Sequence, residues 1–234
     1  MGIPKSTPTM SKSLRVLAAL IGYPDSRLRG DLPEMRALLR AESALPASRL
    51  RELDALMQTL QSTDPLDSEA AYVDLFDRGR ATSLHLFEHV HGDSRERGPA
   101  MIDLGQTYEN AGLLLVEGEL PDYLPAVLEF VSTQPPAEAR AFLGEMAHIF
   151  KAIFAALAQR DSAYASALAA LLDLAGESIE PAQPSLAAAE ESLDASWVEP
   201  EVFAGCSSQG QARPGQAQPI HIVRAASAAQ GASS

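Results

Sequence analysis

The sequence predicts an all-α protein, a single helical bundle domain with a flexible C-terminal tail. Hydrophobic residues make up 46% of the chain and aromatic residues only 6%, and the dominance of Ala and Leu favours helices over strands. Nearly every segment before about residue 177 places apolar residues at three- and four-residue spacing, and no segment alternates with the period of a strand. A length of 234 residues fits one compact domain with appendages, or at most two small domains.

The N-terminal half is predicted to contain short amphipathic helices joined by turns. The first helix ends where Gly22 and Pro24 interrupt the apolar pattern. Asp64 and Pro65 begin another helix, because aspartate caps free backbone N–H groups and proline suits the first helical position. The helices expected here cover residues 14–21, 32–42, 47–61, 65–76, 82–90 and 93–115.

The C-terminal half is predicted to contain longer, more apolar helices. Asp122 is expected to cap a helix over residues 123–133, which Pro135 and Pro136 end. Two Ala- and Leu-rich helices follow over residues 137–159 and 161–177. We therefore expect a flexible N-terminus over residues 1–10, the helical domain over 11–178, a linker with room for a short helix near Trp197 over 179–204, and a disordered tail over 205–234.

The charge is strongly acidic, with 31 Asp and Glu against 18 Lys and Arg. Such a chain repels nucleic acid and anionic lipid, so neither is an expected partner. No Lys or Arg lies between Arg97 and Arg140, which favours either plain solubility or a basic partner. No apolar run approaches the ~18 residues of a membrane span, and Cys206 is the only cysteine. We therefore expect a reducing compartment, no direct membrane insertion and no internal disulfide.

His85, Glu88 and His89 form the H-x-x-E-H pattern of a class of zinc proteases. On a helix these three residues would share one face, but a catalytic zinc needs a third protein ligand that the sequence does not identify. The favoured alternative is a charged helix–loop–helix corner without catalytic residues, a metal or a cofactor. In that corner four arginines, Arg78, Arg80, Arg95 and Arg97, would pair with Asp77, Glu88, Asp93 and Glu96.

Residues 64–104 closely resemble the NarJ family, the assembly chaperones of respiratory nitrate reductase within the wider TorD/DmsD/NarJ group of redox-enzyme maturation proteins. Three blocks carry the resemblance: YVDLFDRGR at 72–80, LFEHVHG at 86–92 and SRERG at 94–98. A fourth block, ELPDYLPAVLEF at 119–130, is similar to the E-P-D-H/Y-x-P loop of the wider group, with Leu120 intervening. The motif Tyr23-Pro24-Asp25 also fits, and the resemblance runs from about Leu14 to about Ala175.

The resemblance implies an all-helical protein that is not an enzyme. It implies a cytoplasmic chaperone that binds the N-terminal segment of the nitrate reductase catalytic (alpha) subunit, a vestige of a twin-arginine signal. This chaperone keeps the subunit competent for molybdenum cofactor insertion before membrane assembly. Two alternatives stay open: a chaperone of a sister molybdoenzyme of the dimethylsulfoxide or trimethylamine-oxide reductase type and, remotely, a zinc hydrolase. The motif FEHVHG belongs to the family pattern, whereas the histidine at position 85 does not.

A basic, amphipathic segment fits an apolar groove with acidic rims. We hypothesise that the fourth block lines this groove, although Pro121 and Asp122 could equally cap a helix. The rest of the family motif is expected to form a scaffold instead of contacting the client. The groove candidates are Glu119, Pro121, Asp122, Tyr123 and Leu124. The corner candidates are Tyr72, Asp74, Phe76, Arg78, Gly79, Glu88, His89, His91, Gly92, Arg95, Arg97 and Gly98.

Overall fold

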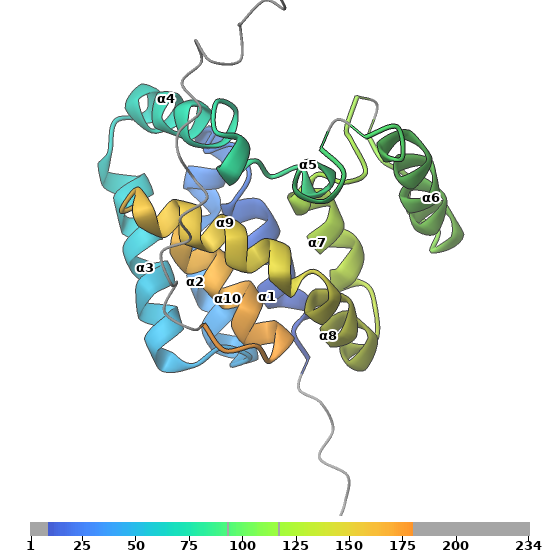
Figure 1. Ribbon diagram of the computed structural model, residues 1–234. Helices are drawn as coiled ribbons and strands as arrows, with labels where there is room; N and C mark the ends of the chain where they lie inside the picture. Colours follow the sequence, from blue (N-terminus) through green and yellow to red (C-terminus); the bar gives the residue numbers. More distant parts are fainter. Residues whose placement is uncertain (1–8, 93, 117, 180–234) are drawn as a thin grey trace, which may run out of the picture. The chain divides into compact units, whose positions relative to one another are not determined.

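A computed structural model describes residues 9–92, 94–116 and 118–179 of the chain. The chain divides into two units, Met1–Gln183 and Pro184–Ser234, and every described residue belongs to the first. The predicted tail and the short helix near Trp197 lie outside the described residues. The described residues form helices without a strand, so the all-α prediction is confirmed (Figure 1). The helices are α1 (Ser11–Leu20), α2 (Ser26–Glu42), α3 (Ala47–Ser62), α4 (Pro65–Phe76), the 3₁₀ turn η1 (Arg80–Thr82), α5 (Leu86–Val90), α6 (Arg97–Asn110), α7 (Leu124–Ser132), α8 (Pro136–Glu145), α9 (Ala147–Gln159) and α10 (Ala165–Ala175).

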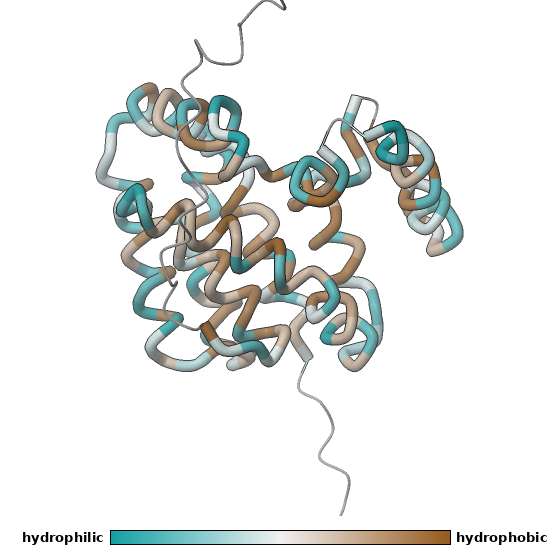
Figure 2. The backbone as a smooth tube through the Cα atoms, viewed as in Figure 1, coloured by the Kyte–Doolittle hydropathy of each residue, from teal (hydrophilic) through white to brown (hydrophobic). Residues whose placement is uncertain are grey.

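The hydrophobic core is built around α1 and α10. Helix α1 packs against α2, α7 and α10, and α10 also packs against α3, α8 and α9. Figure 2 shows hydrophobic residues along most of α7, α9 and α10. A helix that is apolar on nearly all sides must be surrounded by other elements, and every residue from Ala167 to Leu172 is buried accordingly. Each fully buried leucine contributes about 1.5–3 kcal/mol of transfer free energy.

Aspartate side chains set two of the N-terminal helix starts. Asp64 Oδ1 accepts a hydrogen bond from the Leu66 N–H at 2.9 Å, with Pro65 in the first helical turn, as predicted. Asp25 Oδ1 accepts one from the Leu28 N–H at 2.8 Å. Helix α2 therefore begins at Ser26, earlier than predicted, and continues through Pro33.

Three further predicted helices differ from the structure by more than the exact position of their ends. The predicted helix 137–159 is two helices, α8 and α9, which meet at a 62° bend just after Gly144, a poor helix former. The predicted helix 82–90 is η1 followed by α5, because the intervening backbone extends and His85 forms an isolated antiparallel bridge with Tyr123. The predicted helix 93–115 is shortened to α6, and Gly112 adopts a left-handed φ of 77° just after it.

Among the described residues, no single helix is both long enough and apolar enough to span a membrane. The bent pair α8–α9 meets the two requirements only when its helices are taken together. Leu143, Phe150 and Ile153 of this pair are buried in the core.

Candidate peptide-binding cleft

A cleft of about 570 Å³ lies between α7 and the segment that follows α6. Tyr108 and Phe130 are buried side chains in its wall. A volume of this size is within the range of pockets that hold ligands or peptide side chains. The residues that line the cleft are Arg15, Tyr108, Leu113, Leu114, Leu115, Val116, Glu119, Tyr123, Pro125, Ala126, Glu129, Phe130 and Thr133.

One wall of the cleft is an apolar strip, residues 113–116, in which Leu113 and Leu115 are half-buried and Leu114 and Val116 are exposed. Its leucines and valine follow Gly112 and precede Gly118, and both glycines have positive φ, at 77° and 91°. Leu114 is 85% exposed and Val116 is 78% exposed. Large apolar side chains exposed beside a cleft mark an interaction site. The sequence did not predict this strip, because its four apolar residues continue the helical pattern of the preceding segment.

Tyr108 joins α6 to the other wall of the cleft. It is the buried residue of α6, its ring lies 4.9 Å from that of Phe130, and its hydroxyl donates to the Pro121 carbonyl at 2.7 Å. Burial raises the pKa of the Tyr108 hydroxyl, so this group stays protonated and remains a hydrogen-bond donor. Pro121, a predicted groove residue, therefore contributes its carbonyl to the support of the cleft.

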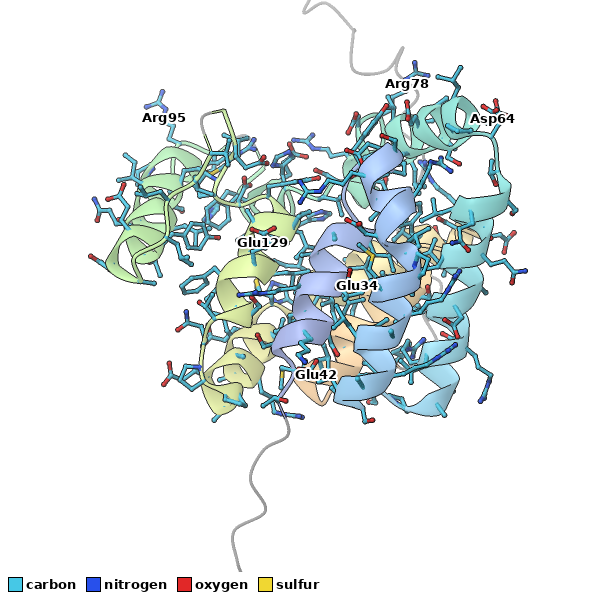
Figure 3. The ribbon with its side chains drawn as sticks, turned by 180° about the vertical axis from the view of Figure 1, so that it is seen from behind. Glu34, Glu42, Asp64, Arg78, Arg95 and Glu129 are labelled. Atoms are coloured by element: carbon cyan, nitrogen blue, oxygen red, sulfur yellow. The ribbon has the colours of Figure 1, made fainter. Side chains whose placement is uncertain are left out.

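The rim of the cleft carries two carboxylates and one guanidinium. Glu119 and Glu129 are exposed, and Glu129 belongs to α7 (Figure 3). Arg15 lies at the same cleft and donates to Ser132 Oγ at 3.2 Å. No Lys or Arg occurs between Arg97 and Arg140. Neighbours in sequence therefore do not neutralise Glu119 and Glu129.

The predicted groove residues divide into two groups. Glu119 and Tyr123 line the cleft, and their contact with a client peptide stays a prediction. Asp122 and Leu124 do not, because both are 0% exposed. Leu124 is held in the core, where its N–H donates to the Leu84 carbonyl at 2.8 Å. This part of the groove hypothesis is corrected: alternation along the segment turns one neighbour to the cleft and the next to the interior.

The Asp122 side chain forms a hydrogen bond with the backbone of α5, although the two are far apart in the sequence. Its Oδ2 accepts a hydrogen bond from the Phe87 N–H at 3.1 Å, and its Oδ1 lies 3.3 Å from His85 Nδ1. The Arg97 guanidinium is 4.0 Å away. The prediction that Asp122 caps the helix at 123–133 is wrong, since α7 begins at Leu124 after Tyr123 without a side-chain cap. A buried carboxylate requires such donors, and here they come from α5, from His85 just before it and from Arg97 at the start of α6.

The H-x-x-E-H residues do not converge. His85 precedes α5, so the expected shared helix face is wrong. Its ring is directed to Asp122, and the hydrogen bond to that carboxylate raises the pKa of His85. His89 Nε2 lies 2.8 Å from the Ser83 carbonyl, and Glu88 pairs with Arg97 at 3.6 Å. Across the described ranges no group of three or more His, Cys, Asp or Glu is placed to hold a metal ion.

The structure separates residues that were predicted to form one charged corner. Arg97 joins Glu88 and Asp122, and the His91 ring packs edge-on against Phe87 at 5.3 Å beside Gly92. Arg78 instead pairs with Asp74 on the exposed side of α4 at 3.3 Å. Figure 3 shows Arg78 and Arg95 well apart in that view, so these two arginines do not share one corner. Gly98 lies in α6 with open space around it, and Asp93 is outside the described residues.

Gly79 occupies a turn that has no space for a side chain. The Thr82 hydroxyl donates to the Leu75 carbonyl and to the Gly79 carbonyl, the latter at 3.1 Å. A Cβ atom at Gly79 would collide with the Thr82 hydroxyl and press on the Leu75 carbonyl. This glycine of the family motif therefore serves the connection between α4 and η1.

Three family motifs meet at a tyrosine cluster. The buried Tyr72 hydroxyl donates to the Ile21 carbonyl at 3.0 Å and lies 3.4 Å from the Tyr123 hydroxyl. The Tyr72 ring contacts Tyr23 at 5.6 Å and Phe76 at 4.7 Å between ring centroids. Segments 23–25, 72–80 and 119–130 are thus neighbours in space, and the cluster supports the cleft residue Tyr123.

The described residues thus form an all-helical domain with an open cleft whose walls are apolar and whose rim carries Glu119, Glu129 and Arg15. The sequence profile of the family described as "Nitrate reductase delta subunit" matches residues 42–170. The chain belongs to this family, and the predicted NarJ-family membership is confirmed.

Named relatives lie in the same family. Over 196 residues the chain is 42% identical to the nitrate reductase molybdenum cofactor assembly chaperone NarJ of Escherichia coli K12, which covers 81% of this chain and 83% of that protein. It is 38% identical to the probable assembly chaperone NarW of the same strain, over 81% of this chain and 82% of that protein. It is 34% identical to a probable assembly chaperone NarJ of Bacillus subtilis, over 67% of this chain and 84% of that protein. These relatives are chaperones, and the protein is accordingly not an enzyme.

A solved structure, of a putative redox enzyme maturation protein from Archaeoglobus fulgidus, matches with a TM-score of 0.49 and 21% identity, over 73% of this chain and 96% of that chain.

Proposed function

We propose that this protein is a cytoplasmic chaperone for nitrate reductase. In this proposal it binds the N-terminal segment of the catalytic subunit and keeps that subunit competent for molybdenum cofactor insertion before membrane assembly. The names of the relatives, nitrate reductase molybdenum cofactor assembly chaperones, support the client. The cleft between α7 and the apolar strip supports the mode of binding.

The observation that carries the proposal is the combination of Leu114 and Val116, both strongly exposed, with Glu119 and Glu129 on one cleft. An amphipathic helix binds such a surface by placing its apolar face on the strip and on Phe130. Lysine or arginine residues at the edges of that helix then lie near the carboxylates. A segment derived from a twin-arginine signal combines these two properties.

The rim carboxylates should act mainly on the rate of association. Exposed charges interact through high-dielectric solvent, so each pair contributes little to affinity. Complementary potentials nevertheless steer encounter and disfavour acidic competitors. We therefore expect binding of the segment to slow as salt rises, while the apolar strip sets the dissociation rate.

Calorimetric titration with a synthetic peptide of the client's N-terminal segment tests the proposal. The wild-type protein should bind the peptide saturably in low salt, and Leu114→Asp should weaken binding by about tenfold or more, equivalent to about 1.4 kcal/mol. Leu66→Asp is the matched control, because Leu66 is a similarly exposed leucine that does not line the cleft. The same titration with the N-terminal peptide of a dimethylsulfoxide reductase measures the selectivity of the chaperone between the two client enzymes. Absence of saturable binding to the wild-type protein would overturn the proposal.

A further inference from the structure

The cleft runs along one face of α7. Ala126, Phe130 and Thr133 all line it, and their spacing of i, i+4 and i+7 places them on one side of the chain as it coils. Helix α7 has 9 residues, which gives a length of about 14 Å at the rise of an α-helix. A client helix of similar length that lies along α7 therefore has one end near the start of α7 and the other near its last residue.

A carboxylate lies at the first of these ends. Glu119 comes shortly before Tyr123, the residue that precedes α7, and both line the cleft. Burial raises the pKa of the Tyr123 hydroxyl, and the negative charge of Glu119 raises it further, as expected when a carboxylate lies near that hydroxyl. The end of the cleft at the start of α7 is therefore negative.

A guanidinium lies at the other end. Arg15 comes from α1, and its Nε donates to the Oγ of Ser132, the last residue of α7, at 3.2 Å. The Ser132 hydroxyl donates in turn to the Glu129 carbonyl at 2.6 Å. This bond through Nε leaves the two terminal nitrogens of Arg15 as further donors. Among the described residues no carboxylate forms an ion pair with Arg15, which is exposed at the cleft.

The order of charges along the cleft matches the polarity of a helix. Glu119 lies at the start of α7, Glu129 lies on α7 one turn before Ser132 (Figure 3), and Arg15 lies at the end. The N-terminal end of any helix carries partial positive charge and its C-terminal end partial negative charge. The charges of the cleft are complementary to a client helix whose first turn lies at Glu119 and whose last turn lies at Arg15.

We propose that Arg15 fixes the direction in which the client segment binds, by holding the C-terminal end of the bound helix. This inference rests on the proposed function for the identity of the client. The terminal nitrogens of Arg15 donate to oxygen acceptors of the last helical turn, where the backbone carbonyls have no partner within the helix. The first turn of the client, with its basic residues, lies at Glu119. The client helix therefore runs parallel to α7.

The opposite direction fits the cleft less well. It places the positive end of the client helix against Arg15, and like charges across an interface are unfavourable. It also places the free carbonyls of the client at Glu119, in a stretch of sequence without Lys or Arg. The dipole of α7 favours this opposite direction, but it corresponds to only about half an elementary charge at each end. The full charges of Glu119 and Arg15 outweigh it.

Calorimetric titration of variants tests the role of Arg15. The probe is a synthetic peptide of the client's N-terminal segment, amidated at its C-terminus to imitate the continuing chain. Lys12→Gln is the matched control, because Lys12 is an exposed cation of the same helix that does not line the cleft. Arg15→Gln should weaken binding by about three- to fivefold, and Lys12→Gln should stay within about 1.5-fold of the wild type.

Arg15→Lys should restore only part of the affinity, because an ammonium group cannot bond Ser132 and also present two coplanar donors to the client. All of these side chains are exposed, so the variants should unfold at the wild-type temperature. If Arg15 merely repelled a basic segment, Arg15→Gln would tighten binding. Tighter or unchanged binding by Arg15→Gln would therefore overturn the inference.

The direction itself is measured by nuclear magnetic resonance, with a nitroxide on either the first or the last residue of the peptide. The nitroxide on the last residue should weaken the amide signals of Ser132 and Thr133 most strongly, and the one on the first residue those of Glu119 and Leu120. A reversed pattern, or the same pattern for both labels, removes the inference and leaves the proposed function standing. Absence of saturable peptide binding to the wild type removes both.

Discussion

The hydroxyl of Tyr72 lies 3.4 Å from the hydroxyl of Tyr123 and donates to the Ile21 carbonyl at 3.0 Å. Tyr72 belongs to α4 and Tyr123 immediately precedes α7, so this pair joins the helix that carries the family block at 72–80 to the cleft. Burial raises the pKa of both hydroxyls, and both therefore remain neutral donors in the physiological range.

Tyr72→Phe should lower the free energy of unfolding by about 1–2 kcal/mol, because it leaves the buried Ile21 carbonyl without its donor. Urea titration followed by circular dichroism measures the change. Tyr23→Phe is the control, since it removes a hydroxyl that bonds Glu69 in solvent. If the two substitutions have equal effects, Tyr72 does not carry the internal hydrogen bond.

Asp122→Ala should destabilise the protein by about 3 kcal/mol, because the Phe87 N–H and the Arg97 and His85 side chains all lose their buried acceptor. Asp64→Ala provides the comparison. Its side chain caps only the exposed start of α4, and its loss should cost about 1 kcal/mol. Equal losses in a denaturant titration would mean that Asp122 acts merely as a local cap.

His85 should make stability depend on pH. Its folded-state pKa is raised above the ordinary 6.5, first by the hydrogen bond to Asp122. The stabilisation that protonated His85 adds to the folded state is therefore complete below the unfolded-state pKa. It is lost as pH rises through the higher folded-state pKa. The unfolding free energy of the wild type should exceed that of His85→Gln by more at about pH 5.5 than at about pH 8.5.

The control for His85 is the same comparison in an Asp122→Asn background. Removing the carboxylate charge should flatten the pH dependence of the difference, since this charge favours the protonated ring. A difference that keeps its pH dependence in that background would assign the effect to another group.

Gly79→Ala should destabilise the protein by about 1–3 kcal/mol, because the new methyl group collides with the Thr82 hydroxyl and the Leu75 carbonyl. Gly98→Ala is a matched substitution of another glycine from the same motif. Open space surrounds Gly98 in α6, so alanine should be neutral or stabilise by up to about 1 kcal/mol. Thermal unfolding distinguishes the two, and a destabilised Gly98→Ala would contradict the packing seen around α6.

The sequence by itself determined the helical class, most helix positions and the family. Apolar residues recur with helical spacing because one face of each helix must be buried. Caps such as Asp64 act on N–H groups two residues away and can be read locally. The bend between α8 and α9 was missed because both helices share one apolar pattern, and the packing around each decides the break.

Only the tertiary structure decided the roles of individual site residues. Asp122 has the sequence position of a cap for α7, yet its carboxylate binds α5, which lies 35 residues away along the chain. His85 looked incidental or zinc-binding, and it contacts that same carboxylate. Glu119 and Tyr123 reach the cleft while Leu124 is buried. Hydrogen bonds and burial between distant segments depend on how helices pack, and no local pattern of residues encodes that distance.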